Sequence, residues 1–237
     1  MTDSVFRLAS ADVIKQRGLR DRVYDRVLDV LLRSDTTPGM RLSIEAVARE
    51  LGVSPTPVRE ALVLLERTGL VTREANKGYR VAPQLADDQL DALFDARLVL
   101  ESGAAALASA HEVALVPRLR AALAEHEAMT AVVRAASTAG ELPVDLLRDY
   151  FAVDWNFHHL IFEGTHNPFL IDMSAGISTR VHRMRQTLQT GVSDADDAVR
   201  EHRAIVDAFA EGPDAAALAM RTHIERVRER SRSDSVL

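Results

Sequence analysis

The sequence predicts a mainly α-helical protein, with an N-terminal winged helix-turn-helix and a C-terminal all-helical antiparallel bundle of about six helices. The N-terminal third holds three short segments with apolar residues at helical spacing, two of them joined by a tight turn. Two strand-like segments with a Gly-containing turn follow. The remainder repeats apolar residues at helical spacing without strand-like alternation. We therefore divide the chain into a flexible arm at 1–19, a winged helix-turn-helix domain at 20–83 and a helical domain at 84–237.

The composition is that of a folded protein without disulfides. Of the 237 residues, 47% are hydrophobic and none is cysteine, so a sizeable core is expected and thiolate metal sites are excluded. No apolar run approaches the roughly 20 residues that span a membrane. Residues 1–20 lack the apolar core of a secretory signal. We therefore expect no membrane span and a cytoplasmic protein.

Charge is divided unevenly along the chain. The net charge of −6 argues weakly against a nucleic-acid partner. Residues 1–83, however, carry 14 Lys and Arg against 11 Asp and Glu, a formal charge of +3, which leaves −9 for residues 84–237. A modest asymmetry of this kind also arises by chance, but its direction suits a DNA-binding head on an acidic body.

Two helices are expected before the tight turn. From Asp21 onward, apolar residues recur at helical spacing, at Val23, Val27, Leu28, Leu31 and Leu32. Turn residues at 36–39 end this helix, and residues 40–42 form a short extended link. Ser43 is expected to cap a second helix, whose inner side carries Val47, Ala48 and Leu51.

The stretch at 51–62 predicts a helix end, a tight turn and a new helix start. Gly52 can adopt the left-handed conformation that closes a helix, and the hydroxyl of Ser54 can cap the next one. Pro55 and Pro57 fall in the first turn of the new helix, where proline is tolerated.

This new helix, at about 54–67, combines an inward apolar face with a polar edge. The inward face carries Val58, Ala61, Leu62 and Leu65. Thr56 and Arg59 fall off that face, so Arg59 is able to reach a phosphate or a guanine edge, as in a helix that reads the major groove. Taken alone, the stretch fits an ordinary surface hairpin of two helices equally well.

A short ribbon follows the candidate reading helix. Residues 71–74 and 79–81 predict two strands joined by a turn at 75–78 that contains Gly78. Three helices and such a ribbon make a winged helix-turn-helix. Lys77 and Arg80 place positive charge on the wing, where DNA phosphates would lie.

After a short linker at 83–86, the pattern is helical to the end. We expect helices at about 87–111, 114–137, 143–164, 167–190, 194–211 and 213–231, separated by Gly, Pro and Asn residues. The Ala-rich stretch at 103–110 indicates close packing between helices.

These segments resemble the GntR family of bacterial transcription regulators, in its FadR-type branch with an all-helical FCD effector domain. The N-terminal motifs are PGMRL at 38–42, LGVSPTPVREAL at 51–62, LE at 65–66, GLV at 69–71 and GYRV at 78–81. In the helical part they are Arg97, Glu101, Asp154, Phe157, His158, Asn167, Glu201, His202, Ile205, His223 and Ile224. The resemblance covers about residues 20–230. It implies a dimeric repressor or activator whose hold on operator DNA changes when a metabolite binds.

The resemblance also implies which residues contact DNA. The family positions are matched here by Ser54, Thr56, Arg59, Lys77 and Gly78. Two departures matter: the position after Ser54, often Arg in the family, is Pro55, and a position in the second helix that can be basic is Glu45. Both remove a cation that could read a base, so the operator sequence cannot be taken from a relative.

One Asp and three His predict a metal site in the helical part. Asp154 and His158 are four residues apart, so they share a helix face, and that face is otherwise apolar. His202 and His223 lie on the apolar faces of two further helices. Three imidazole nitrogens and one carboxylate suit zinc, nickel, iron or manganese and leave positions open for an outside ligand.

A single His on an apolar face is more often a hydrogen-bonded core residue than a metal ligand. The metal-binding members of the GntR family, however, have an Asp and three His at the same four places, which favours a divalent metal, zinc first. The remaining histidines are expected to be surface or packing residues: His111, His126, His159, His166 and His182.

Arg97 allows two interpretations: a salt bridge with Glu101, four residues on, or a fork for a ligand carboxylate beside the metal. We expect a metabolite-responsive regulator that is not an enzyme, a repressor released by a small carboxylate. One alternative is a metal-dependent hydrolase, for which the sequence lacks a His-Glu-x-x-His helix and a clear general base. The other is a DNA-binding protein with a purely structural metal.

Overall fold

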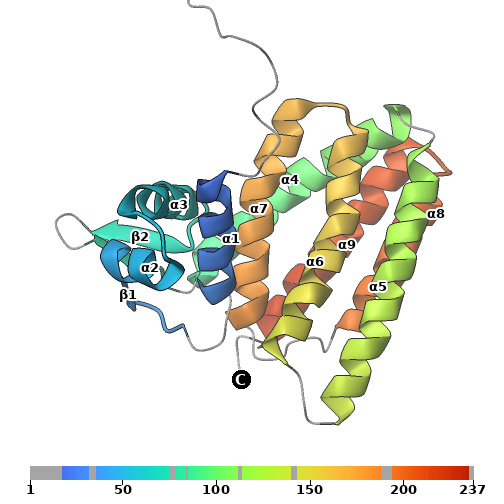
Figure 1. Ribbon diagram of the computed structural model, residues 1–237. Helices are drawn as coiled ribbons and strands as arrows, with labels where there is room; N and C mark the ends of the chain where they lie inside the picture. The colour runs from blue at the N-terminus through green and yellow to red at the C-terminus, as the bar shows by residue number, and fades with distance from the viewer. Residues whose placement is uncertain are drawn as a thin grey trace, which may run out of the picture.

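The computed structural model describes residues 18–31, 36–74, 78–83, 85–111, 114–139, 143–187 and 194–234. Over these residues the chain forms nine α-helices and three short strands (Figure 1). A small N-terminal domain of short helices and strands lies beside a domain of long helices, which confirms the predicted fold class. The expected arm at 1–19 falls almost entirely outside the described residues. None of the described helices is long and apolar enough to cross a membrane.

Three helices build the N-terminal domain: α1 (Leu19–Leu31), α2 (Ile44–Leu51) and α3 (Pro55–Arg67). The predicted start and end of α2 are both present. The Ser43 hydroxyl accepts a hydrogen bond from the Ala46 backbone N–H and caps α2. Gly52, with φ of 65°, closes α2 in the left-handed conformation. The shared core contains Val23, Val27, Leu31, Leu42, Ala48, Val58, Ala61, Leu62, Leu65, Leu70, Val71, Tyr79 and Val81.

The predicted hydroxyl cap of Ser54 is wrong. Ser54 occupies the N-cap position of α3, but its side chain makes no capping hydrogen bond. An N-cap hydroxyl accepts from the N–H of the second or third helical residue. The third is Pro57, which has no N–H, so only the N–H of Thr56 remains, and Ser54 does not bond to it. Ser54 is therefore an exposed residue at the start of α3 that does not cap the helix with its side chain.

The wing is a three-stranded sheet, not the predicted two-stranded ribbon. β2 (Val71–Glu74) and β3 (Gly78–Val81) pair antiparallel as expected. β1 (Arg41–Leu42), expected to be only an extended link, pairs antiparallel with the other edge of β3, so the strand order is β1-β3-β2. Leu42 lies opposite Tyr79 and both are buried, so β1 ties the wing to the core of this domain.

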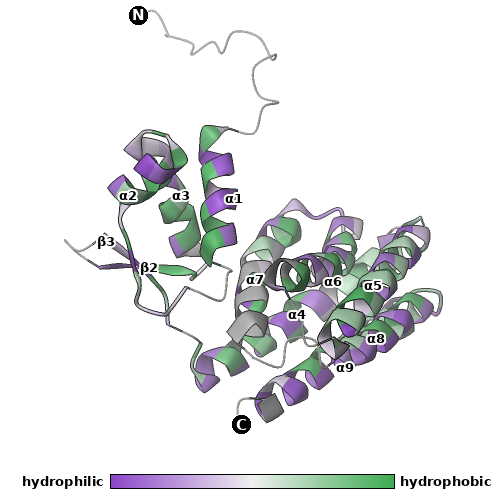
Figure 2. Cartoon of the chain, turned by 60° about the horizontal axis from the view of Figure 1, so that its bottom comes forward, coloured by the Kyte–Doolittle hydropathy of each residue, from purple (hydrophilic) through white to green (hydrophobic). Residues whose placement is uncertain are grey.

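Six long helices form the second domain, within a few residues of the predicted ranges. They are α4 (Asp87–His111), α5 (Leu115–Thr138), α6 (Val144–Gly164), α7 (Pro168–Thr187), α8 (Ala195–Ala208) and α9 (Pro213–Asp234). In Figure 1 they lie side by side as a bundle. Helix α4 packs most extensively against α9, and α5 packs against α6 and α8. Figure 2 shows hydrophilic residues along the outer faces of these helices.

Small residues let α4, α5 and α6 approach closely. Ala104, Ala105 and Ala108 of α4 are buried, as expected for the Ala-rich stretch. A Cβ added to Gly164, at the end of α6, would lie 2.5 Å from Leu115 Cδ2 and 3.2 Å from Ala108 Cβ. Because such tight packing leaves little room for adjustment, it fixes the positions of the polar side chains that α4 and α6 turn inward.

Ion pairs tie α9 to α4. Arg228 donates to Asp91 at 3.2 Å and to Asp95 at 2.9 Å, and Arg232 donates to Asp91 at 2.5 Å. The hydrogen bonds from Arg232 and Arg228 hold the pKa of Asp91 below its usual range. Exposed pairs of this kind add little stability individually, but together they set the register of the two helices.

Candidate metal centre and nucleic-acid interface

Helix α3 presents a polar edge outside the core of the N-terminal domain. Ser54, Thr56 and Arg59 are all exposed. Arg59 lines a groove of about 270 Å³ together with Arg73 of β2 and Gly78 of β3. The groove joins the candidate reading helix to the wing, and its two guanidinium groups suit DNA phosphates. Arg73 was not among the predicted contacts, although its exposed place on β2 could have marked it.

The predicted positive charge of the wing is partly offset. The Arg80 guanidinium lies 3.0 Å from the Glu74 carboxylate and donates to the Gly39 carbonyl at 3.0 Å. Arg80 is thus engaged within the sheet and links β3 to the residues before β1. Lys77 lies outside the described residues.

Glu45 places a negative charge beside the candidate reading helix. It is exposed at the start of α2 and accepts a hydrogen bond from the Ser43 hydroxyl at 3.0 Å. A backbone hydrogen bond at the helix start, the Ser43 hydroxyl and the charge of Arg59 hold the pKa of Glu45 below its usual range. Glu45 is therefore ionised at neutral pH and close enough to Arg59 to interact with it.

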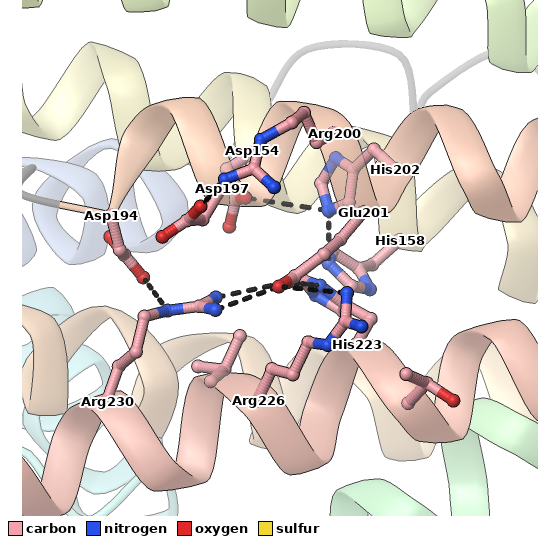
Figure 3. A network of polar contacts seen from close by, with 12 residues as sticks. Asp154, His158, Asp194, Asp197, Arg200, Glu201, His202, His223, Arg226 and Arg230 are labelled. Carbon is pink, nitrogen blue, oxygen red and sulfur yellow. Dashed lines mark hydrogen bonds and ion pairs between the residues drawn. The ribbon is translucent and has the colours of Figure 1, made fainter.

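The helical domain brings the four predicted metal ligands together in its core. Asp154 and His158 lie on α6, His202 on α8 and His223 on α9, and none is more than 3% exposed. The Nε2 atoms of His158 and His202 are 3.2 Å apart, and Asp154 Oδ1 lies 3.8 Å from His202 Nε2. The three imidazoles each offer a nitrogen within 4.8 Å of the others. Figure 3 shows the four side chains turned toward one another from three helices.

This donor set fits a divalent metal. Two nitrogens bound to one ion at 2.0–2.1 Å, with tetrahedral or octahedral angles, are about 2.8–3.4 Å apart, and the two Nε2 atoms of His158 and His202 lie 3.2 Å apart. His223 Nε2 is buried and makes no hydrogen bond to any described atom. A buried polar atom without a partner is costly, and a metal–nitrogen bond would satisfy it.

Two buried carboxylates orient two of the imidazoles. Glu101 Oε2, on α4, lies 2.7 Å from His158 Nδ1. Glu201 Oε2, on α8, lies 2.8 Å from His223 Nδ1. A carboxylate accepts the Nδ1–H of a neutral imidazole, which leaves the lone pair on Nε2. The hydrogen bond at His223 Nδ1 and the 2.7 Å contact at His158 Nδ1 thus both favour a ring with its lone pair on Nε2, the atom that would bind the metal.

Arginines keep these two carboxylates ionised. Burial raises the pKa of Glu101, but the positive charge of Arg97 and the contact with His158 outweigh burial and lower that pKa to about 2. Burial likewise raises the pKa of Glu201, and hydrogen bonds from His223 and Arg230 outweigh it and lower the pKa to about 2. The Arg230 guanidinium donates to Glu201 at 2.8 and 3.1 Å, as Figure 3 shows.

Two of the imidazoles are neutral at neutral pH. Burial lowers the pKa of His223 to about 4, against the hydrogen bond to Glu201, which raises it. Burial and the neighbouring imidazoles lower the pKa of His202 well below its usual range. Histidine ligates metals in its neutral form, so neither ring must lose a proton to bind one near pH 7.

His126 also belongs to this cluster, although its place there was not predicted from the sequence. It was expected to be a surface or packing residue, but it is fully buried on α5, with Nδ1 3.1 Å from His202 Nδ1. Its Nε2 lies 3.7 Å from Asp154 Oδ1. The available signal was its place on the inward stripe of α5 with Leu119, Leu123, Thr130 and Val133.

The other histidines whose side chains the structure describes lie outside the cluster. His111 Nδ1 lies 3.4 Å from the Thr165 carbonyl, and His159 Nε2 lies 3.6 Å from Glu163. His166 follows α6 with a φ of 52°. The side chain of His182 is outside the described part of the chain.

Arg97 forms the salt bridge with Glu101 that was one of its two predicted roles, and one nitrogen of its guanidinium makes no hydrogen bond to a described atom. Its Nε donates to Glu101 at 2.6 Å, and the side chain is almost fully buried. Its Nη1 is also buried and makes no hydrogen bond to a described atom. The structural interpretation of Arg97 is thus correct, and the geometry leaves one guanidinium nitrogen for a second partner.

A cavity of about 820 Å³ lies between the two domains. Its lining includes Tyr24 of α1 and Leu64 of α3 on one side, and Trp155 and Asn156 of α6 on the other. Figures 1 and 2 both place α1 next to α7 at this junction. Trp155 also stacks on His158, so one side chain borders both the metal-ligand cluster and the DNA-binding domain.

Two family models match separate parts of the chain. Residues 19–81 match the family model of bacterial regulatory proteins, gntR family, and residues 92–226 match that of the FCD domain. An uncharacterized HTH-type transcriptional regulator in an unstable DNA locus of Streptomyces ambofaciens is 31% identical over 213 residues, covering 89% of this chain and 84% of that protein. A probable D-xylose utilization operon transcriptional repressor of Paenarthrobacter nicotinovorans is 29% identical over 218 residues, covering 90% of each. The solved structure of E. coli McbR/YncC shares the fold, with a TM-score of 0.69 at 21% identity over 92% of this chain and 99% of that one.

Proposed function

The chain belongs to the GntR family of bacterial transcription regulators and carries the FCD domain, and we propose that it represses its genes until a small carboxylate binds beside a divalent metal in the helical domain. The observation that carries the proposal is the convergence of Asp154, His158, His202 and His223 in an apolar core. Repression as the sign of regulation is supported by the name of the Paenarthrobacter relative.

The DNA-binding unit in this proposal is a homodimer on a near-palindromic operator. One helix-turn-helix makes too few base contacts for useful specificity, so two copies read two half-sites. The exposed start of α3, with Ser54, Thr56 and Arg59, enters the major groove. Gly78 of β3 and Lys77, which lies outside the described residues, are the expected contacts to the phosphate backbone.

The effector site is built from the metal ligands and Arg97. A divalent ion, zinc first, supplies positive charge and open coordination positions when bound. An anion alone could not be desolvated in so apolar a bundle. Arg97 adds a second positive group: its Nη1 has no hydrogen bond to a described atom, and a guanidinium matches a carboxylate geometrically. A small mono- or dicarboxylate is therefore the expected effector class.

Coupling between the two domains runs through α6 and the interdomain cavity. The ligands come from α6, α8 and α9, so a filled coordination shell changes how these helices sit relative to one another. Trp155 contacts His158 on one side and lines the cavity with Tyr24 and Leu64 on the other. The linker at 83–86 is short, so a shift there alters the spacing of the two reading helices. Release requires that the effector bind the DNA-free arrangement more tightly than the DNA-bound one.

The test is a mobility-shift experiment with the DNA upstream of the protein's own gene. Chelator-treated and zinc-loaded protein are compared, each with and without a panel of small carboxylates. We expect one carboxylate to release the DNA from zinc-loaded protein only, and light scattering to give two chains per DNA site. Tight binding that no carboxylate changes would instead indicate a structural metal. Binding by a single chain per site would contradict the dimer.

A further inference from the structure

His126 is a buried polar residue to which the proposed effector site gives no role. It lies on α5 and is fully buried among aromatic rings, with its ring centroid 4.9 Å from that of His202 and 5.2 Å from that of Tyr150. The atom it turns to His202 is Nδ1, which lies 3.1 Å from His202 Nδ1. This is a hydrogen-bond distance between two like atoms.

Two like nitrogens can form that bond only if one carries a hydrogen and the other does not. A neutral imidazole has one N–H and one lone pair, on different nitrogens. A metal bound at His202 Nε2 needs the lone pair there, which puts the hydrogen of His202 on Nδ1. His126 Nδ1 must then be the acceptor, so His126 carries its own hydrogen on Nε2.

We propose that His126 is a positioning residue that selects the tautomer of His202, holding its Nε2 lone pair toward the metal. This role rests on the metal site proposed above. In it, His126 contacts a metal ligand and not the metal itself. The surroundings of its other nitrogen agree with this tautomer: His126 Nε2 lies 3.7 Å from Asp154 Oδ1, too far for a hydrogen bond but close enough for a carboxylate to favour an N–H there over a lone pair.

His126 completes a pattern around the three imidazoles. His158 and His223 each present Nδ1 to a carboxylate, from Glu101 and Glu201 respectively. Among the described residues, the partner of His202 Nδ1 is the Nδ1 atom of His126 and not a carboxylate. A neutral acceptor at this place orients the ring without adding a negative charge to a core that already holds three carboxylates.

Nitrogen NMR of the zinc-loaded protein, with ¹⁵N-labelled histidine, tests the assignment directly. Long-range ¹H–¹⁵N correlations distinguish a protonated, an unprotonated and a metal-bound ring nitrogen. We expect His202 with hydrogen on Nδ1 and zinc on Nε2, and His126 with hydrogen on Nε2 and none on Nδ1. Hydrogen on His126 Nδ1, or zinc on either nitrogen of His126, would overturn the proposal. This measurement uses the wild-type chain and does not depend on whether a variant folds.

Substitutions give a second test through zinc affinity, measured by competition with a chelating dye. His126→Phe fills the space but cannot accept a hydrogen bond, so its zinc affinity should fall about 10–100-fold. His126→Asn places an amide oxygen where Nδ1 lies and should recover most of that loss. The matched control is Thr130→Val, which removes a buried hydroxyl one turn away on α5 and should leave zinc affinity unchanged.

Failure of this inference is distinguishable from failure of the metal site. Wild-type protein that binds no zinc overturns the metal site and the role of His126 with it. Wild-type protein that binds zinc, together with a folded His126→Phe variant that binds it equally tightly, overturns the role of His126 alone.

Discussion

The indole of Trp155 stacks on the imidazole of His158, with ring centroids 5.7 Å apart and planes 20° from parallel. Trp155 is the single tryptophan of the chain. It is also half-buried at the cavity between the domains. The one indole of the chain is therefore in contact with a proposed metal ligand and with the junction to the DNA-binding domain.

Trp155 emission should report metal binding. Cobalt(II), which has an open shell and quenches nearby indoles, should lower the emission on stoichiometric addition, whereas closed-shell zinc should then displace it and restore the signal. The measurement is a fluorescence titration. His202→Ala with His223→Ala should abolish the response, and His111→Ala, at a histidine outside the cluster, should keep it. An equal loss of emission in the double variant would show that cobalt acts elsewhere.

Arg59→Ala should weaken operator binding without destabilising the fold. Arg59 is exposed on α3 and off its buried face, so the core is unchanged, while a bidentate base contact is worth about 1–3 kcal/mol. Fluorescence anisotropy at several salt concentrations measures both affinity and salt slope. The charge-matched control is Arg120→Ala, on the exposed face of α5 in the other domain. Unchanged affinity with an unchanged salt slope would remove α3 as the reading helix.

Glu45→Gln should tighten DNA binding. Glu45 is ionised at neutral pH and near Arg59, so its charge repels phosphates and competes for the guanidinium. The glutamine can still accept from the Ser43 hydroxyl, which preserves the start of α2. Glu125→Gln, at an exposed position of α5, removes the same charge far from the DNA surface and should have no effect. Equal or weaker binding by Glu45→Gln would contradict this role.

The metal-free protein should lose stability as the pH falls from about 6.5 toward 4. His223 has its pKa lowered to about 4 in the fold, so between these values the unfolded chain binds a proton that the folded chain does not. The His223 contribution is complete above pH 6.5 and its loss at pH 4 is on the order of 3 kcal/mol. Urea unfolding in chelator at pH 7.5 and 5 measures the change. His223→Leu should make the dependence shallower, and an unchanged slope would show that His223 titrates normally.

The fold was largely predictable because its signals are local. Helical spacing of apolar residues and the Gly52 turn each depend on neighbours in the chain, and the helices of both domains lie near their predicted ranges. The failures came from competing local effects. Pro57 removes one of the two N–H groups that the Ser54 hydroxyl could have capped, and β1 is two residues long, too short to show an alternation.

The candidate site was predictable only in part. The four-residue spacing of Asp154 and His158 predicts that they share a helix face. Contacts between different helices, however, cannot be predicted from a single sequence. The partners Glu101 and Glu201, and the contact of His126 with His202, arise when α4, α5, α8 and α9 pack together. A single histidine on an apolar helix face has the same sequence pattern whether it only packs in the core or orients a metal ligand. The contact of His126 with His202 was not predicted for that reason.

The most direct test of the central claim compares wild-type protein with the double variant His202→Ala and His223→Ala. Metal content is measured by elemental analysis, and operator binding by anisotropy as the releasing carboxylate is titrated. We expect wild-type protein to carry one divalent metal per chain and to release DNA. The variant should lose the metal, keep operator affinity and stop responding to the carboxylate. If metal-free protein released the DNA at the same carboxylate concentration, the metal-dependent effector site would be contradicted.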